Sequence, residues 1–215
     1  MSAIKHQTRS LMAHEPKDFR RLISECRGFL SEKQLEAHFT LYQGYVKKLN
    51  EIETGLKEAD PETANYSFGE YSELRRREPV AYNGTVLHEL YFENLGPKGG
   101  EAPAAFKKEA QRAHGTWDAA LADLKAMAES AHGWVLVTYD WNFGVVRHNL
   151  VQSEHHVGLL PNQTVLVAID CWEHAYFADY QTRKAEYLDG LFEHLNWGPV
   201  AQRLGLTPVG AAGKR

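Results

Sequence analysis

The chain has 215 residues, 43% hydrophobic and 24% charged, which is enough for one large domain or two small ones that pack closely. Its formal net charge of −4 argues against nucleic acid as the principal partner, and no apolar stretch is long enough to predict a membrane span. Cys26 and Cys171 form no close-spaced pair, and the first residues lack the apolar core of a secretion signal. We therefore expect a reduced, cytoplasmic location.

The first half of the sequence predicts an arm followed by a long helix. Residues 1 to about 30 show no clear hydrophobic period, so we expect an extended arm with short turns. In "SEKQ", Ser31 and Gln34 form a capping box, in which the hydroxyl accepts from the Gln34 amide and the Gln34 side chain reaches back. Apolar residues then recur at spacings of three and four, which predicts an amphipathic helix to about residue 59.

A second helix is predicted over about residues 81–95, after a loop that Pro79 closes. Its inward side carries His88, and the apolar stripe of the first helix likewise contains His38. A single inward histidine is more often a hydrogen-bonded core residue than a ligand. Neither histidine alone therefore indicates a site.

The second half predicts an α/β domain. "GPKGGEAP" is the best candidate boundary, which divides the chain into residues 1–98 and 99–215. Two helices are followed by three strand candidates, "WVLVTYDW", "GVVRHNLV" and "TVLVAID", and then by the helical segments "CWEHAYFADYQT" and "KAEYLDGLFEHLNW". The fold class is therefore α+β, with a helical N-terminal hairpin domain before a domain with a three-stranded antiparallel sheet.

Four residues of metal-ligating type stand out. Asp170 and His174 lie four residues apart where the last strand passes into a helix, so both face one way if the chain turns at once. Such a pair alone more often caps a helix than binds a metal. With His38 and His88 it would make three imidazoles and one carboxylate, a set that suits Mn, Fe or Zn better than Mg or Ca. The spacing does not show that the four converge.

"DCWEHAY" resembles the D-x-W-E-H-A-[FY] signature of the iron/manganese superoxide dismutases. "LSEKQLEAHF", "YNGTVLHELYFENLGP", "HGWVLV" and "HLNWGPVAQRL" are similar to further segments of that family, in the same order, over about residues 15–205. The resemblance implies one Fe or Mn ion between the two domains, held by His38, His88, Asp170 and His174. It also implies that superoxide is converted to dioxygen and hydrogen peroxide while the metal cycles between +3 and +2.

Around these ligands the sequence departs from the family pattern. Tyr45 resembles the gateway tyrosine, but it follows His38 by seven residues where eight are usual. The histidine that is common between them is replaced by Leu41 or Tyr42, and its usual tyrosine partner is Phe177. The loss of both members is a coordinated change, and it puts the usual proton route through that pair in doubt.

The group that hydrogen-bonds the metal-bound solvent in the family comes from one of two places. The first is Gly84 here, which would free that space, and the second holds His155. By themselves His155 and His156 are more often a solvated pair, but the family register selects His155. Histidine at this place favours iron over manganese.

The resemblance assigns roles to four further residues. Trp134 and Trp172 would form walls of the site, whereas the second tryptophan of the family's G-x-G-W-x-W segment is Leu136. Glu173 would reach across a two-fold axis to a ligand histidine of a second subunit, which implies a homodimer, with a tetramer also open. Lys184 matches a basic position that steers the superoxide anion.

Two alternatives to an active dismutase stay open. The first is a dismutase-like metal-binding protein with weak or altered redox activity, which the shortened spacing and the missing pair motivate. The second is a non-catalytic interaction protein on the same fold. The four intact ligands argue against the second alternative.

Overall fold

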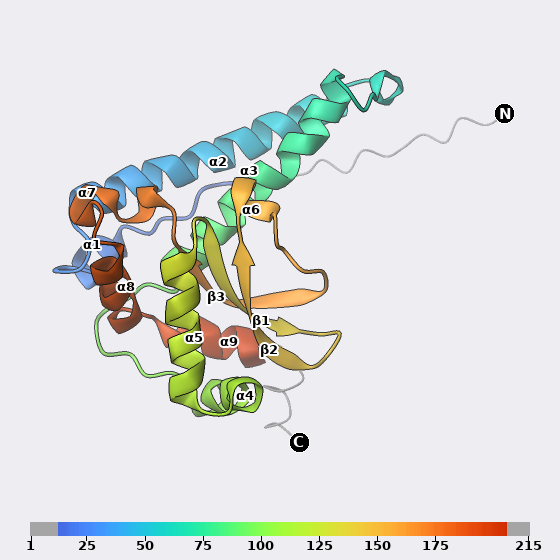
Figure 1. The fold of residues 1–215 in the computed structure, drawn as a ribbon. Coiled ribbons are helices and arrows are strands. Elements are labelled where there is room, and N and C mark those ends of the chain that lie inside the picture. The colour runs from blue at the N-terminus through green and yellow to red at the C-terminus, as the bar shows by residue number, and fades with distance from the viewer. Residues whose placement is uncertain (1–12, 206–215) are drawn as a thin grey trace.

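The computed structural model describes residues 13–205, and their first half is a helical hairpin that extends away from an α/β body (Figure 1). The two long helices pack side by side over much of their length. The elements of this half are α1 (Arg21–Glu25), α2 (Glu32–Glu58), the 3-10 turn η1 (Pro61–Thr63) and α3 (Glu70–Glu93). The expected arm thus contains a short helix, and residues 1–12 of it lie outside the described part.

Helix α2 begins and runs as the sequence predicts. The Ser31 hydroxyl accepts from the Gln34 amide at 3.1 Å, which satisfies one of the free donors of the first turn. The helix then continues without interruption to Glu58. It buries one face along most of its length: Gln34, Leu35, His38, Phe39, Tyr42, Val46 and Leu49.

Helix α3 begins earlier than predicted. It starts at Glu70 and continues through Pro79, where a loop with only a short helical piece was expected to end. A proline inside a helix removes one backbone donor and crowds the preceding turn, at a cost of about 3 kcal/mol. The prediction was wrong because α3 packs along α2, and most helix stability in proteins comes from such packing rather than from local propensity.

The second half contains the predicted three-stranded sheet, with strand order β2-β1-β3 and both pairs antiparallel. The strands are β1 (Trp134–Asp140), β2 (Val145–Val151) and β3 (Gln163–Asp170). Every residue of the central strand β1 is buried. The register places Asp170 at the end of β3 opposite Trp134 at the start of β1, so the sheet ends at a point where an acid and an indole are neighbours.

Helices surround this sheet, some in shorter pieces than predicted. They are α4 (Ala104–His114), α5 (Trp117–Ser130), α6 (Ser153–His156), η2 (Glu173–Ala175), α7 (Phe177–Tyr180), α8 (Lys184–Glu193) and α9 (Trp197–Gly205). The segment "CWEHAYFADYQT" therefore forms a 3-10 turn and a four-residue helix. The segment "KAEYLDGLFEHLNW" contains all of α8 and the first residue of α9.

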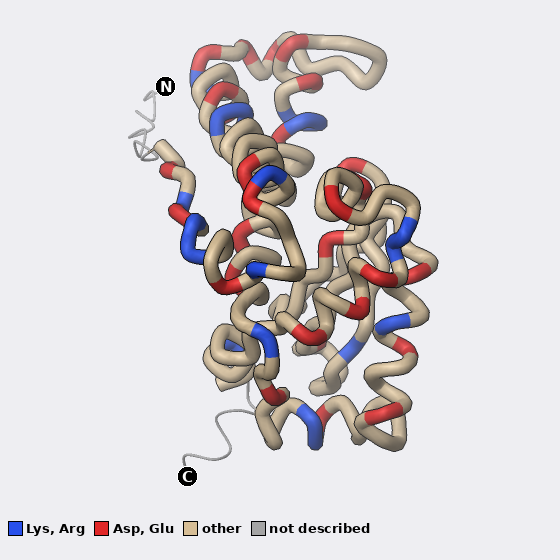
Figure 2. The backbone as a smooth tube through the Cα atoms, turned by 90° about the vertical axis from the view of Figure 1, so that its left-hand side faces the viewer, with Lys and Arg blue, Asp and Glu red and all other residues tan. Residues whose placement is uncertain are grey.

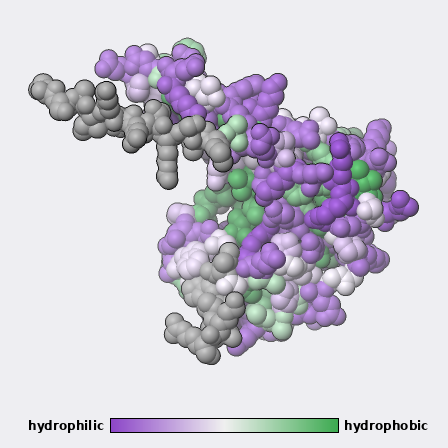
Figure 3. All heavy atoms as spheres, turned by 180° about the vertical axis from the view of Figure 1, so that it is seen from behind, coloured by the Kyte–Doolittle hydropathy of each residue, from purple (hydrophilic) through white to green (hydrophobic). Residues whose placement is uncertain are grey.

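One apolar core runs through both halves, and the division at residue 98 stays a prediction. Basic and acidic residues are interspersed along the hairpin (Figure 2). From behind, the surface is mostly hydrophilic, with apolar side chains gathered in the hollow beside the hairpin (Figure 3). Within residues 13–205 no helix is both long and apolar enough to cross a bilayer.

Candidate metal centre

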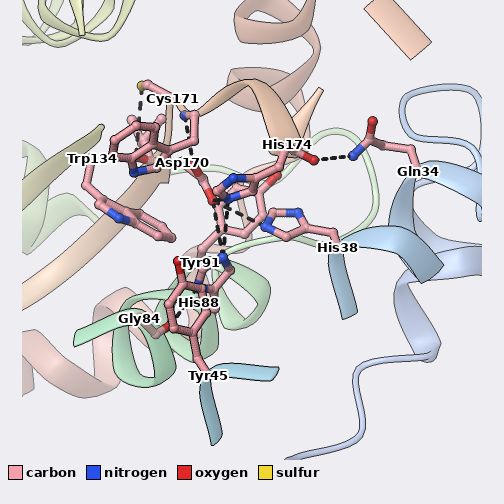
Figure 4. A network of polar contacts seen from close by, with 12 residues as sticks. Gln34, His38, Tyr45, Gly84, His88, Tyr91, Trp134, Asp170, Cys171 and His174 are labelled. Carbon is pink, nitrogen blue, oxygen red and sulfur yellow. Dashed lines mark hydrogen bonds and ion pairs between the residues drawn. The ribbon is translucent and has the colours of Figure 1, made fainter. Parts of the chain in front are cut away.

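The four predicted ligands meet at one point between the hairpin and the sheet (Figure 4). The Asp170 Oδ2 atom lies 3.2 Å from Nε2 of His38, 3.2 Å from Nε2 of His174 and 3.7 Å from Nε2 of His88. The Nε2 atoms of His88 and His174 are 3.4 Å apart. Helices α2 and α3 each supply one ligand, while β3 and the turn after it supply two.

Backbone and buried polar contacts fix the Asp170 carboxylate. Its Oδ1 atom accepts from the Trp172 amide at 2.9 Å, so Oδ2 is left to face the three imidazoles. The Tyr187 hydroxyl donates to the Asp170 carbonyl at 2.8 Å and lies 3.1 Å from the hydroxyl of Tyr91 on α3. The strand end that carries Asp170 is therefore held from the side of α8 as well as by the sheet.

Hydrogen bonds position two of the three ligand histidines, His88 through its ring and His174 through its backbone. Nδ1 of His88 donates to the Gly84 carbonyl one turn earlier in α3, at 2.5 Å, which leaves an Nε2 lone pair for a ligand. The side chain of Gln34 donates to the His174 carbonyl at 2.6 Å and accepts from the Ala178 amide at 3.0 Å. The capping box is therefore wrong in its second half, because the Gln34 side chain holds the His174 turn rather than its own helix.

Burial sets the protonation of the ligands. It lowers the pKa of His88 to about 3, assisted by repulsion from His38, and it also lowers the pKa of His38. Burial by itself would raise the pKa of Asp170, but attraction to His174 and His38 and the hydrogen bond from His174 outweigh it and hold that pKa below its usual range. Neutral imidazoles and a carboxylate are the forms that coordinate a metal.

Two observations, the unpartnered ring nitrogens of His38 and the spacing of the ligand atoms, show that these residues fit a metal ion. His38 is 1% exposed, yet neither of its ring nitrogens has a hydrogen-bond partner among the described residues. A buried polar atom without a partner is costly, and a metal bond would satisfy Nε2. Ligand atoms about 2.1 Å from one ion lie about 3.0–3.6 Å from one another at angles of roughly 90–120°, which is close to the spacing observed here.

Tyr45, His155 and Trp134 form a hydrogen-bonded row beside the ligands. The indole Nε1 of Trp134 donates to Nδ1 of His155 at 2.8 Å, and Nε2 of His155 lies 2.7 Å from the Tyr45 hydroxyl. Burial lowers the pKa of His155, so the ring is neutral. Because an indole can only donate, the single ring proton of His155 stands on Nε2 and points to Tyr45.

The backbone around His155 is unusual. Glu154 and His155 have φ of 52° and 62°. These values lie in the left-handed region of the backbone, which residues other than glycine rarely adopt. An ion pair of 2.8 Å between Arg77 on α3 and Glu154 ties this turn to the hairpin. His155 is thereby buried at the site, while His156 is only half-buried and bonds the Glu154 carbonyl. No hydrophobic period in the sequence indicates this turn, and only the family register points to His155.

The shortened spacing between His38 and Tyr45 is accommodated without a bulge. Seven residues are two turns of the continuous helix α2, so the Tyr45 ring reaches the His88 ring, with centroids 5.4 Å apart. The space expected to be free at Gly84 is filled: a β-carbon there would lie 2.4 Å from Cδ1 of Tyr45. That expectation was wrong because the Tyr45 ring itself occupies the space.

The structure also shows what stands in place of the histidine and tyrosine pair of the family pattern. Of Leu41 and Tyr42, Tyr42 is the buried one, and its hydroxyl donates to Glu89 at 2.8 Å and accepts from the Lys17 amide at 2.9 Å. Phe177 is 48% exposed, far from filling the role of a buried hydrogen-bonding tyrosine. The polar group of this region therefore points away from the metal centre, toward α3 and the N-terminal arm.

The remaining site residues lie at the edge. Trp172 is half-buried, with its ring nearly parallel to that of His174 and 6.4 Å from it, whereas Leu136 is buried within β1. Glu173 is exposed next to His174. The Lys184 ammonium donates to the carbonyls of Ala131 and Glu129 at 2.5 and 3.1 Å, so it caps the end of α5.

Comparison with known proteins agrees with this geometry. Residues 102–203 match the family described as iron/manganese superoxide dismutases, C-terminal domain. The chain is 40% identical over 179 residues to "Superoxide dismutase [Fe]" of Aquifex aeolicus. This alignment covers 81% of this chain and 84% of that protein. It is 39% identical to the protein of the same name from Aquifex pyrophilus, over 88% of this chain and 90% of that one.

A manganese relative is similar over the same extent. The chain is 32% identical to "Superoxide dismutase [Mn] 2" of Haloferax volcanii, over 81% of this chain and 86% of that protein. Identity at this level over most of both chains, together with the four converging ligands, leads to one assignment. The chain belongs to the iron/manganese superoxide dismutase family.

Proposed function

We propose that this protein is a superoxide dismutase with one Fe or Mn ion per subunit, held by His38, His88, Asp170 and His174. The convergence of these four side chains carries the proposal. The Nε2 atoms of the three histidines lie 3.2–3.7 Å from one carboxylate oxygen of Asp170, which makes the four side chains a ready set of ligands. When bound, the ion supplies one-electron chemistry by cycling between +3 and +2. His155 at the site favours iron.

The reaction turns two superoxide ions and two protons into dioxygen and hydrogen peroxide, so the site must deliver protons. The row from Trp134 through His155 to Tyr45 supports this role. Burial raises the pKa of Tyr45, so its hydroxyl stays protonated, and His155 donates to that oxygen. The Tyr45 hydrogen is then free to point to the metal-bound solvent or to the substrate.

A groove between α2 and α3 leads toward this hydroxyl. Its volume is about 440 Å³, its walls are largely apolar, and Tyr45 lies among its lining residues. The cations Lys48 and Arg77 are balanced there by Glu51 and Glu73, so the groove itself is not cationic. We propose that Lys184 steers the superoxide anion, since a cation near an opening raises the local concentration of a small anion, and that Trp172 excludes bulk water from the His174 side.

The exposure of one ligand supports a homodimer. His174 is 30% exposed, whereas the other ligands are 1% exposed or less. Among the described residues nothing hydrogen-bonds its Nδ1 atom, and Glu173 beside it is exposed. We propose that Glu173 of one subunit accepts from the partner's His174, with a tetramer as a further assembly of such dimers.

The buried cysteines support the expected location. Cys26 and Cys171 are both free, and a pair of unbridged thiols fits a reducing compartment. We therefore propose that the protein works in the cytoplasm, which cell fractionation would test.

One experiment tests the function. Protein purified from its native source should contain Fe or Mn and should inhibit the reduction of cytochrome c by superoxide, with activity proportional to metal content. Bound Fe or Mn with negligible dismutation would favour a dismutase-like protein with altered redox chemistry, which the Tyr42 and Phe177 replacements motivate. A folded protein that takes up neither metal would favour a non-catalytic interaction protein.

A further inference from the structure

Away from the ligands described above, two histidines and an aspartate meet where α4, α5 and β2 pack together (Figure 1). His114 is the last residue of α4, Asp123 lies within α5, and His148 lies in β2. A ring nitrogen of each histidine and a carboxylate oxygen of Asp123 all lie within 4.8 Å of one another. The tertiary fold, rather than sequence proximity, brings the three together.

Both imidazoles turn toward one carboxylate oxygen. Nδ1 of His148 lies 2.6 Å from Oδ2 of Asp123, and Nδ1 of His114 lies 3.9 Å from the same atom. The two rings are stacked, with centroids 4.4 Å apart and planes 21° from parallel. The side chain of His148 is 4% exposed and that of His114 is 21% exposed, whereas Asp123 is 50% exposed. Solvent therefore reaches the cluster from the aspartate side.

A hydrogen bond from His148 to Asp123 explains only part of this arrangement. It accounts for the distance of 2.6 Å but not for the His114 nitrogen, which faces the same oxygen from too far to bond. One ion at about 2.1 Å from each ligand atom would need separations of about 3.0–3.6 Å. The short contact would widen by about 0.4–1.0 Å and the long one would close by about 0.3–0.9 Å, which the half-exposed Asp123 side chain allows.

We propose that His114, Asp123 and His148 form a second metal site, which binds one divalent cation of the Zn²⁺ type. Two imidazoles and one carboxylate suit Zn²⁺, Co²⁺, Ni²⁺ or Cu²⁺, whereas Mg²⁺ and Ca²⁺ prefer oxygen ligands alone. Water would complete the coordination on the open side. The bound ion ties the helix pair α4–α5 to the edge strand β2, so its role is to stabilise the α/β half.

The test uses Zn²⁺ and the protein that already holds its Fe or Mn. Calorimetric titration should show one bound Zn²⁺ per chain, with the Fe or Mn content unchanged before and after. The melting temperature should rise with added Zn²⁺, since a ligand that binds only the folded state stabilises it. The variants His114→Gln and Asp123→Asn should bind Zn²⁺ at least about tenfold more weakly, the size of effect expected when a metal site is impaired.

The matched control is His14→Gln. His14 is also a partly exposed histidine beside a carboxylate, 3.0 Å from Glu53, but among residues 13–205 no second imidazole lies with it, so Zn²⁺ binding should not change. Because His148 is almost fully buried, its role is read in the wild-type protein: X-ray absorption at the zinc edge should show two imidazole ligands. Three results would overturn the proposal: no Zn²⁺ bound, Zn²⁺ bound only as Fe or Mn is lost, or undiminished affinity in both variants.

Discussion

The ring of Tyr45 lies where a side chain on residue 84 would begin, so Tyr45 and Gly84 share one place in the wall of the metal centre. The shortened spacing from His38 lets the Tyr45 ring lie against α3, and only glycine leaves room for it there. Nε2 of His155 then lies 2.7 Å from the Tyr45 hydroxyl. These three residues form a set, in which each fits because of the other two.

Gly84→Ala tests this fit. The new methyl group must displace the Tyr45 ring, so we expect the hydrogen bond to His155 to break and activity per bound metal to fall by about tenfold or more. Overpacking costs about 1–3 kcal/mol, against up to about 1 kcal/mol gained in helix propensity. The control is Gly44→Ala on α2, where a β-carbon meets nothing within 4 Å, so stability should rise and activity should not change. Full activity in Gly84→Ala would show that the close contact is unimportant.

Two substitutions at His155 separate its hydrogen bonds from its bulk. Glutamine can accept from Trp134 and donate to Tyr45, as the imidazole does, whereas alanine can do neither. We expect His155→Ala to lose about 10–100-fold in activity and His155→Gln to retain most of it. Activity is measured by the cytochrome c assay and normalised to metal content. Equal losses in both variants would remove the hydrogen-bonded row from the mechanism.

His38→Ala should abolish metal binding. Without this ligand the set falls to two imidazoles and one carboxylate, so we expect metal content to collapse and activity to fall by about 100-fold or more. Elemental analysis measures the first and the superoxide assay the second, while circular dichroism checks the fold. His14→Ala, which removes a surface histidine, should keep both metal and activity. A metal-replete, active His38→Ala protein would refute the ligand assignment.

The metal-free protein should lose stability as the pH falls below neutrality. Burial lowers the pKa of His88 from 6.5 to about 3, so between these values the unfolded chain takes up a proton that the folded chain refuses. Stability rises with pH wherever the unfolded state binds more protons, so it falls as the pH drops from about 6.5 toward 3. Chemical denaturation of the apoprotein at a series of pH values measures the slope. In His88→Gln this part of the slope should be missing, and an unchanged slope would contradict the assignment.

Glu173→Ala tests the proposed contact between subunits. If Glu173 bonds the partner's His174, its loss should weaken the dimer by about tenfold or more, since a partly buried charged hydrogen bond is removed. Sedimentation at falling concentration measures the dissociation constant. Glu186→Ala removes another exposed carboxylate, on α8, that pairs with Arg183 at the N-cap of the same helix, and it should leave association unchanged. Equal behaviour of the two variants would place the interface elsewhere.

Much of the fold can be predicted because hydrophobic period and strand composition decide it. The long helix α2 and the three strands follow from local pattern, whereas the strand registers do not, because every residue of β1 is buried and offers no alternation to read. The start of α3 does not, because Pro79 is a strong local signal against a helix that packing on α2 overrides. The His174 segment breaks into short pieces because its polar groups are bound by residues far away in the chain, such as Gln34.

The metal ligands can be predicted from the sequence, whereas the packing of the residues around them cannot. His38, His88, Asp170 and His174 can be found from their residue types, the inward position of the helical histidines and the family signature. The Tyr45 ring occupies the space beside Gly84, and the left-handed backbone of Glu154 and His155 directs the His155 ring toward the site. Both features depend on distances between α2, α3 and α6. No single stretch of sequence contains those distances.

The uneven burial of the four ligands also governs how an ion could leave. Among residues 13–205, His38, His88 and Asp170 are buried by the helical hairpin and the sheet, so the turn that carries His174 is the exposed side of the ligand set. That turn is held to α2 through both ends of the Gln34 amide. We expect exchange of a bound metal to require these two hydrogen bonds to break. In a dimer of the kind proposed, the partner subunit would cover the same side, and the residence time of the ion would then depend on assembly as well as on its four bonds.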